Sequence, residues 1–229
     1  MDDNNLTNSE CRPKSILSRF IHPGIRKGTD SSLSEKRNVI SSIFIAMLIT
    51  LAYAETFPVV RESVRTYGLT LGTTILFFVF FLTSMRFFIG NQLHLLSETC
   101  VRMRGDMWLF DFLVITLQTL VLCFLGGLSS VDINYHVQID FVGLLIFLYA
   151  FDIVWIISQK VLGVLFHSWK RALVPWAWAI LNGLLVTAVI VLRLTVGDIY
   201  SNIGLIWLGI LNIIAFMMDI ILIDHYDMI

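Results

Sequence analysis

Residues 141–157 read FVGLLIFLYAFDIVWII, a run in which a single acid, Asp152, interrupts residues that are otherwise apolar, small or aromatic. A helix of about 20 predominantly apolar residues crosses the hydrocarbon core of a bilayer, which is roughly 30 Å thick. Similar runs occur on both sides of this one. The predicted spans are 39–57, 70–91, 107–128, 140–164, 174–195 and 201–223.

These six runs predict an all-α, polytopic membrane protein with six transmembrane helices. Backbone polar groups in lipid must be satisfied within the segment, as they are in a helix. The alternating strand pattern of a membrane barrel is absent. The composition agrees, because 57% of the residues are hydrophobic and only 14% are charged, whereas about 25% are charged in a typical soluble domain.

The distribution of Lys and Arg predicts the orientation. With the N-terminus inside, 13 of the 16 basic residues fall on the inner side, and an excess of basic residues marks cytoplasmic loops. We therefore expect both termini in the cytoplasm and a multi-pass protein of the plasma (inner) membrane. Residues 1–38 are expected to form a basic, largely disordered cytoplasmic tail, and residues 39–229 the transmembrane domain.

Polar side chains fall at similar depths on several predicted helices. Those near the centre of the bilayer are Gln118, Asp152, Asn182 and Asn212. Because a charge at the bilayer centre costs ~2.5–3.5 kcal/mol, these side chains must face each other, water or another subunit. They form either a hydrogen-bonded layer between helices or an ion or proton site. A second set, nearer the cytoplasm and expected to form ion pairs, comprises Arg86, Asp111, Lys160 and Asp219.

Small residues recur at every fourth position of the first predicted helix. They are Ser42, Ala46, Thr50 and Ala54. This spacing allows close approach of helices, so the stripe either packs within the subunit or lines an axis shared by several subunits. In the second case Met47 and Leu51 lie beside the stripe as an apolar constriction, which gates a pore by excluding water.

The start of this helix, Lys36-x-x-x-Ile40-Ser41-Ser42, resembles the first helix of the endolysosomal and bacterial leak-type potassium channels, which begins Arg-x-x-x-Phe-Ser-Asp. The second helix ends at residues 90–96, GNQLHLL, similar to that family's Asn-His-His-x-Leu-Phe ending. The resemblance implies a six-helix subunit, a homotetramer and a pore for monovalent cations. It places Met47 at the family's apolar constriction.

The leading hypothesis is therefore an oligomeric pore that conducts cations and is lined by the first helix. Two alternatives stay open, a proton- or solute-coupled transporter centred on Asp152 and a non-conducting membrane scaffold or effector. We expect no enzyme activity, cofactor or metal site, because no catalytic or metal-binding pattern occurs and the three cysteines form no Cys-x-x-Cys pair. The net charge of −1 indicates no nucleic-acid partner.

Overall fold

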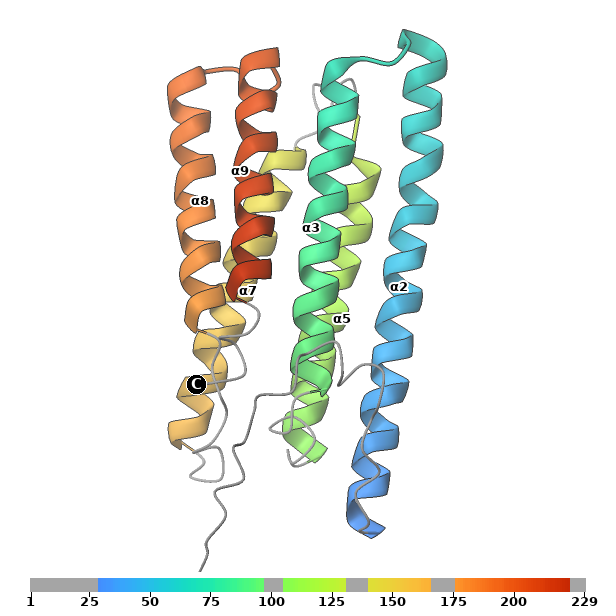
Figure 1. Cartoon of the computed structure of the whole chain (residues 1–229), viewed down its shortest axis with the longest axis vertical. Helices are drawn as coiled ribbons and strands as arrows, with labels where there is room; N and C mark the ends of the chain where they lie inside the picture. The colour runs from blue at the N-terminus through green and yellow to red at the C-terminus, as the bar shows by residue number, and fades with distance from the viewer. Residues whose placement is uncertain (1–28, 97–104, 131–139, 166–175, 223–229) are drawn as a thin grey trace, which may run out of the picture.

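A computed structural model describes residues 29–96, 105–130, 140–165 and 176–222 (Figure 1). These residues form six α-helices and no strand. The helices are α2 (Thr29–Tyr67), α3 (Leu71–Leu96), α5 (Gly105–Gly127), α7 (Phe141–Leu165), α8 (Trp176–Val196) and α9 (Asn202–Leu222). All six are long and apolar enough to cross a membrane. The predicted fold class is confirmed: the protein is an all-α, multi-pass membrane protein.

The first helix is much longer than the predicted span. It begins at Thr29 and ends at Tyr67, so residues 29–38 of the expected tail are helical, while residues 1–28 lie outside the described part of the chain. At 1.5 Å per residue its length is about 58 Å, well beyond the thickness of a bilayer core. The predicted boundary at residue 38 was set by the start of the apolar run. Polar residues can form part of the same helix outside the membrane, and hydropathy does not detect them.

Five of the helices close into a ring. In order around the ring, α3 packs against α9, α9 against α8, α8 against α7, α7 against α5, and α5 against α3. The remaining helix, α2, packs on the outside of α3 and α5, at one edge of the bundle in Figure 1. The interior of the ring is therefore enclosed by a single copy of the chain.

Apolar side chains fill most of the space between the helices and also cover the outside of the bundle. Buried examples are Phe80 and Leu145, whereas Phe124 and Leu194 are 71% and 78% exposed on the outer surface. A water-soluble protein rarely exposes large apolar patches. The exposed side chains are instead suited to contact with lipid.

Polar contacts join the start of α7 to α8 and to the α8–α9 turn at one end of the ring. Asp140 Oδ1 accepts a hydrogen bond from Gly143 N at 2.6 Å, which satisfies a free N–H of the first turn. Tyr200 Oη accepts a hydrogen bond from Val142 N at 3.3 Å, and Arg193 Nη2 donates to Asp140 Oδ2 at 2.9 Å. Burial raises the pKa of Tyr200, so this phenol stays a neutral hydroxyl that fastens the α8–α9 turn to α7.

Candidate functional site

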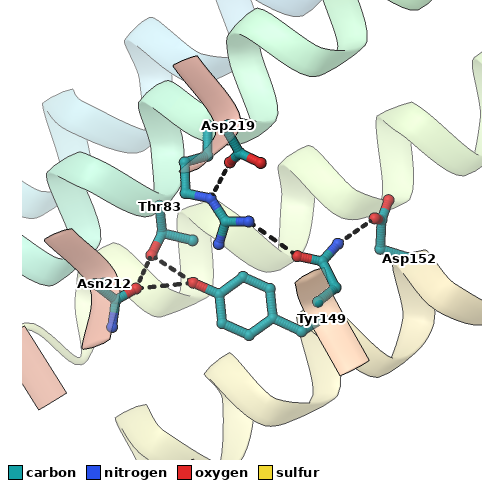
Figure 2. A network of polar contacts seen from close by, with 7 residues as sticks. Thr83, Tyr149, Asp152, Asn212 and Asp219 are labelled. Atoms are coloured by element: carbon teal, nitrogen blue, oxygen red, sulfur yellow. Dashed lines mark hydrogen bonds and ion pairs between the residues drawn. The ribbon is translucent and has the colours of Figure 1, made fainter. Parts of the chain in front are cut away.

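A network of buried polar side chains crosses the inside of the ring and joins all five of its helices. Arg86 on α3 donates from Nε to Asp219 on α9, as an ion pair, and from Nη2 to Asn182 Oδ1 on α8 at 3.1 Å (Figure 2). Asn182 Nδ2 donates to Asp152 Oδ2 on α7 at 2.6 Å. Gln118 Nε2 on α5 donates to Asp152 Oδ1 at 2.7 Å. We call these five residues the central network.

A second group of polar side chains lies beside the central network. Tyr149 Oη donates to Asn212 Oδ1 at 2.9 Å, and Thr83 lies within hydrogen-bond distance of both, at 3.1 and 3.3 Å (Figure 2). The Arg86 guanidinium carbon lies 5.3 Å from the centre of the Tyr149 ring. Asn212 therefore shares the bundle interior with the other predicted midplane residues, and it reaches the central network through Tyr149.

The central network contains two acids and only one base. Arg86 and Asp219 neutralise each other, whereas the hydrogen bonds to Asp152 come from neutral groups, the amides of Gln118 and Asn182 and the side chain of Trp178. Asp152 is 1% exposed. A carboxylate at this depth is costly unless something compensates its charge. Asp152 is therefore the side chain of the network best suited to take up a proton or another cation.

Two atoms of the central network have no hydrogen-bond partner. They are Arg86 Nη1, a donor, and Gln118 Oε1, an acceptor, and both are buried. Buried polar groups in proteins are paired in the great majority of cases. The network therefore retains one unused donor and one unused acceptor inside the bundle.

The second predicted set of charged residues is only partly brought together. Of the four, Arg86 and Asp219 form an ion pair, whereas Asp111 and Lys160 have other partners. Instead, Asp111 Oδ2 contacts His94 Nε2 at 3.0 Å, and its Oδ1 accepts from Trp155 Nε1 at 3.1 Å and Gln159 Nε2 at 2.7 Å.

Lys160 lies elsewhere, with Nζ 4.6 Å from the centre of the Trp176 ring. Lys160 therefore lies apart from Asp111, because residues at one depth on different helices can face different neighbours. Depth follows from position along a span, whereas the facing direction depends on which helices are neighbours.

A repeated motif could have identified Gln159 as a site residue. The pattern Phe-Asp-x-x-x-x-x-x-Gln occurs at residues 110–118 of α5 and again at residues 151–159 of α7. The two helices are neighbours and run in opposite directions (Figure 1). The acid of each motif therefore meets the glutamine of the other, and both hydrogen bonds measure 2.7 Å.

The stripe of small residues on α2 does not keep to one face. Ser42 is half-buried and donates a hydrogen bond to Gln92 Oε1 on α3, and Ala46 is half-buried as well, whereas Thr50 and Ala54 are exposed. A spacing of four residues overshoots one helical turn by about 40°, so such a stripe drifts around the helix. Its first half packs within the subunit and its second half faces outward.

The two predicted constriction residues also face outward in this single chain. Met47 is 66% exposed and Leu51 is 48% exposed. The face of α2 that packs against the bundle consists of other side chains: Asn38, Ser41, Ile45, Ile49, Ala52, Thr56 and Ser63. The outward face is open to lipid or to a second copy.

Comparison of the chain with protein-family models, with curated proteins and with solved structures finds no match. Within the described ranges, no group of three or more His, Cys, Asp or Glu side chains is placed to hold a metal ion. Cys123 is a free thiol, and Cys11 and Cys100 lie outside the described residues. The functional argument therefore rests on the central network.

Proposed function

We propose that this protein is a secondary transporter in which Asp152 binds the coupling ion inside the five-helix ring. The observation that carries the proposal is the central network, an acid held by two amides and the Trp178 side chain beside a buried Arg86–Asp219 ion pair. Ionisable residues inside membrane-spanning helices are rare, and they mark ion and proton pathways in pumps and transporters.

The position of Asp152 supports this proposal. It lies near the middle of α7, and the network around it contains side chains from every helix of the ring. Substrate and coupling-ion sites of transporters also lie near the bilayer midplane, between helices that move relative to one another. A change of charge at Asp152 would act directly on the contacts of α7 with α5 and α8.

The unpaired oxygen of Gln118 supports a working site, because it belongs to a side chain that donates directly to Asp152. A layer that only joined helices would gain most by pairing every donor and acceptor, since an unpaired buried group costs about 1–3 kcal/mol. Arg86 Nη1 and Gln118 Oε1 are both left without a partner. Gln118 contacts Asp152 directly, and Arg86 is connected to Asp152 through Asn182.

Ion flux into liposomes that contain the purified protein tests the proposal. Replacing Asp152 with Asn keeps the shape of the side chain and removes its charge, and we expect it to abolish ion-coupled flux. Glu62→Gln is the matched control, because Glu62 is an exposed acid at the far end of α2 and should tolerate the same change. Full flux in Asp152→Asn would exclude a transporter centred on this residue.

A pore formed by α2 helices from several copies, a tetramer by the family resemblance, is the second candidate. The observation that favours it is the outward position of Met47, Thr50, Leu51 and Ala54, which leaves these residues free to line a shared axis. In that case Met47→Ser should increase the leak of potassium or other monovalent cations by wetting the constriction, and Asp152→Asn should leave it unchanged. No flux in any variant would favour a scaffold or effector.

A further inference from the structure

We infer that the ion bound at Asp152 is a proton, that it binds to Oδ1, and that the Gln118 amide turns from hydrogen-bond donor to acceptor when it binds. The inference rests on the proposed function and names its coupling ion. It follows from the directions of the hydrogen bonds in the central network, taken one residue at a time.

The Asn182 amide can face in only one direction. A guanidinium has donors and no acceptor, so the contact from Arg86 Nη2 requires the oxygen of Asn182 on that side. The amide nitrogen then faces Asp152 Oδ2, at 2.6 Å. Because the ion pair with Asp219 holds Arg86 in place, Oδ2 meets an N–H donor in both protonation states of Asp152.

The Gln118 amide is free to reverse. Its nitrogen donates to Asp152 Oδ1 at 2.7 Å, and its buried oxygen has no partner that would be lost on rotation. The two ends of a carboxamide are almost identical in shape, so a half-turn exchanges donor for acceptor with little change in packing. An ionised Asp152 accepts a hydrogen bond from the Gln118 nitrogen. A protonated Asp152 instead donates a hydrogen bond to the Gln118 oxygen.

This arrangement selects a proton over a metal cation. Hard cations are bound by shells of about six oxygen ligands, whereas the Asn182 N–H occupies Asp152 Oδ2 and a turned Gln118 amide adds only one further oxygen beside Oδ1. A proton needs one carboxylate oxygen and one acceptor. Asp152 Oδ1 and the Gln118 oxygen meet that need once the amide has turned.

The charged and titratable groups around Asp152 allow uptake of a single proton. Arg86 faces it from α3 through Asn182, and Asp219 on α9 neutralises that arginine. Tyr149 lies one turn earlier on α7, and Asp111 lies two turns from Gln118 on α5, in its own cluster with His94. A proton delivered by water forms an O–H bond at Oδ1, and the formal charge of the central network changes from −1 to zero.

Infrared difference spectroscopy of the protein in lipid bilayers tests the inference without measuring transport. Acidification should produce the C=O stretching band of a buried, protonated carboxylic acid. Asp152→Asn should remove this band. Asp152→Glu, which keeps an acid, should move the band to the frequency of a glutamic acid. Replacing choline by sodium or potassium in the buffer should leave the band unchanged.

The Gln118 switch has its own readout in the same spectra. Gln118→Leu removes the acceptor for the O–H group, so the band should move to a higher frequency, typical of a carboxylic acid with one hydrogen bond fewer. Gln92→Leu makes the same change at another buried glutamine, which contacts Ser42, and should leave the band in place. An unchanged band in Gln118→Leu would overturn the switch.

The two proposals fail in different ways. A band that disappears on addition of sodium, or no band that depends on residue 152, would overturn the proton assignment even if the protein transports a solute. A band that depends on residue 152 in a protein without any flux would support the proton site and overturn the transporter.

Discussion

Arg86 is the largest fully buried side chain in the described part of the chain. It is 1% exposed, its Nε pairs with Asp219 and its Nη2 bonds to Asn182. Aromatic rings of Tyr149 and Trp178 lie 5.3 and 5.9 Å from its guanidinium carbon. A lysine could not replace it, because only the planar guanidinium offers donors in a fixed fork and stacks on rings.

Removing one partner of this ion pair should be costly, and removing both should be less so. We expect Arg86→Gln to destabilise the protein by about 3–5 kcal/mol, because Asp219 is left buried without its counter-charge. The double variant Arg86→Gln, Asp219→Asn should recover part of that loss. Thermal unfolding in detergent micelles, followed by tryptophan fluorescence, measures the effect.

Arg193→Gln is the control for this comparison. Arg193 pairs with Asp140, but its side chain is 46% exposed, and exposed pairs contribute only about 0–1 kcal/mol. If the double variant lost as much stability as the two single variants together, the Arg86–Asp219 contact would not be the source of the effect.

Sequence patterns predicted the depth of the interior residues but not their partners. Gln118, Asp152 and Asn182 were placed at one level because each lies near the centre of an apolar run, and the structure joins them. The partners of Asp111 were not predicted, because a span that is apolar on all sides does not reveal which face meets its neighbour. His94 and Gln159 are identified as its partners only once α3, α5 and α7 are placed side by side.

A glycine on α3 makes room for a tryptophan side chain that extends from α8. The ring of Trp178 on α8 lies directly against Gly90 on α3, where an added Cβ would overlap it. Gly90 follows Arg86 by one helical turn, and Trp178 precedes Asn182 by one turn. The glycine therefore leaves room for this ring at the level of the central network.

We expect Gly90→Ala to destabilise the protein by about 1–3 kcal/mol, the usual cost of overpacking a core. The substitution forces the Trp178 ring to move away from residue 90, which should also change tryptophan fluorescence. Gly183→Ala is the control, because the nearest atom to an added Cβ there is Ile153 Cδ1 at 3.9 Å, an ordinary contact. Equal losses in the two variants would show that the close contact of Trp178 with Gly90 is not the source of the effect.

The order of the helices in the ring could not be predicted, although the helices themselves were. Hydropathy identifies a span by its length and mean composition, and all six spans satisfy that criterion. Which spans become neighbours depends on polar and small side chains inside the bundle, such as Gly90 and Asn182. The family resemblance concerned α2 and the end of α3 and therefore did not address the interior of the ring.

Because one chain encloses the central network, a single copy should be sufficient for transport. We therefore expect activity when the protein is diluted in lipid until most occupied vesicles contain one copy. The fraction of active vesicles should rise in direct proportion to protein concentration at low density. A fluorescent pH indicator inside the vesicles, read one vesicle at a time, measures this dependence, and Asp152→Asn protein at the same density provides the background.

A pore lined by α2 makes the opposite prediction. On one chain Met47 and Leu51 face outward, and an axis is formed only when several copies bring these faces together. The fraction of active vesicles would then rise with a higher power of protein concentration and vanish at single-copy density. The concentration dependence thus tests whether the functional path runs inside the five-helix ring or between copies, and a steep dependence would favour the pore over a transporter centred on Asp152.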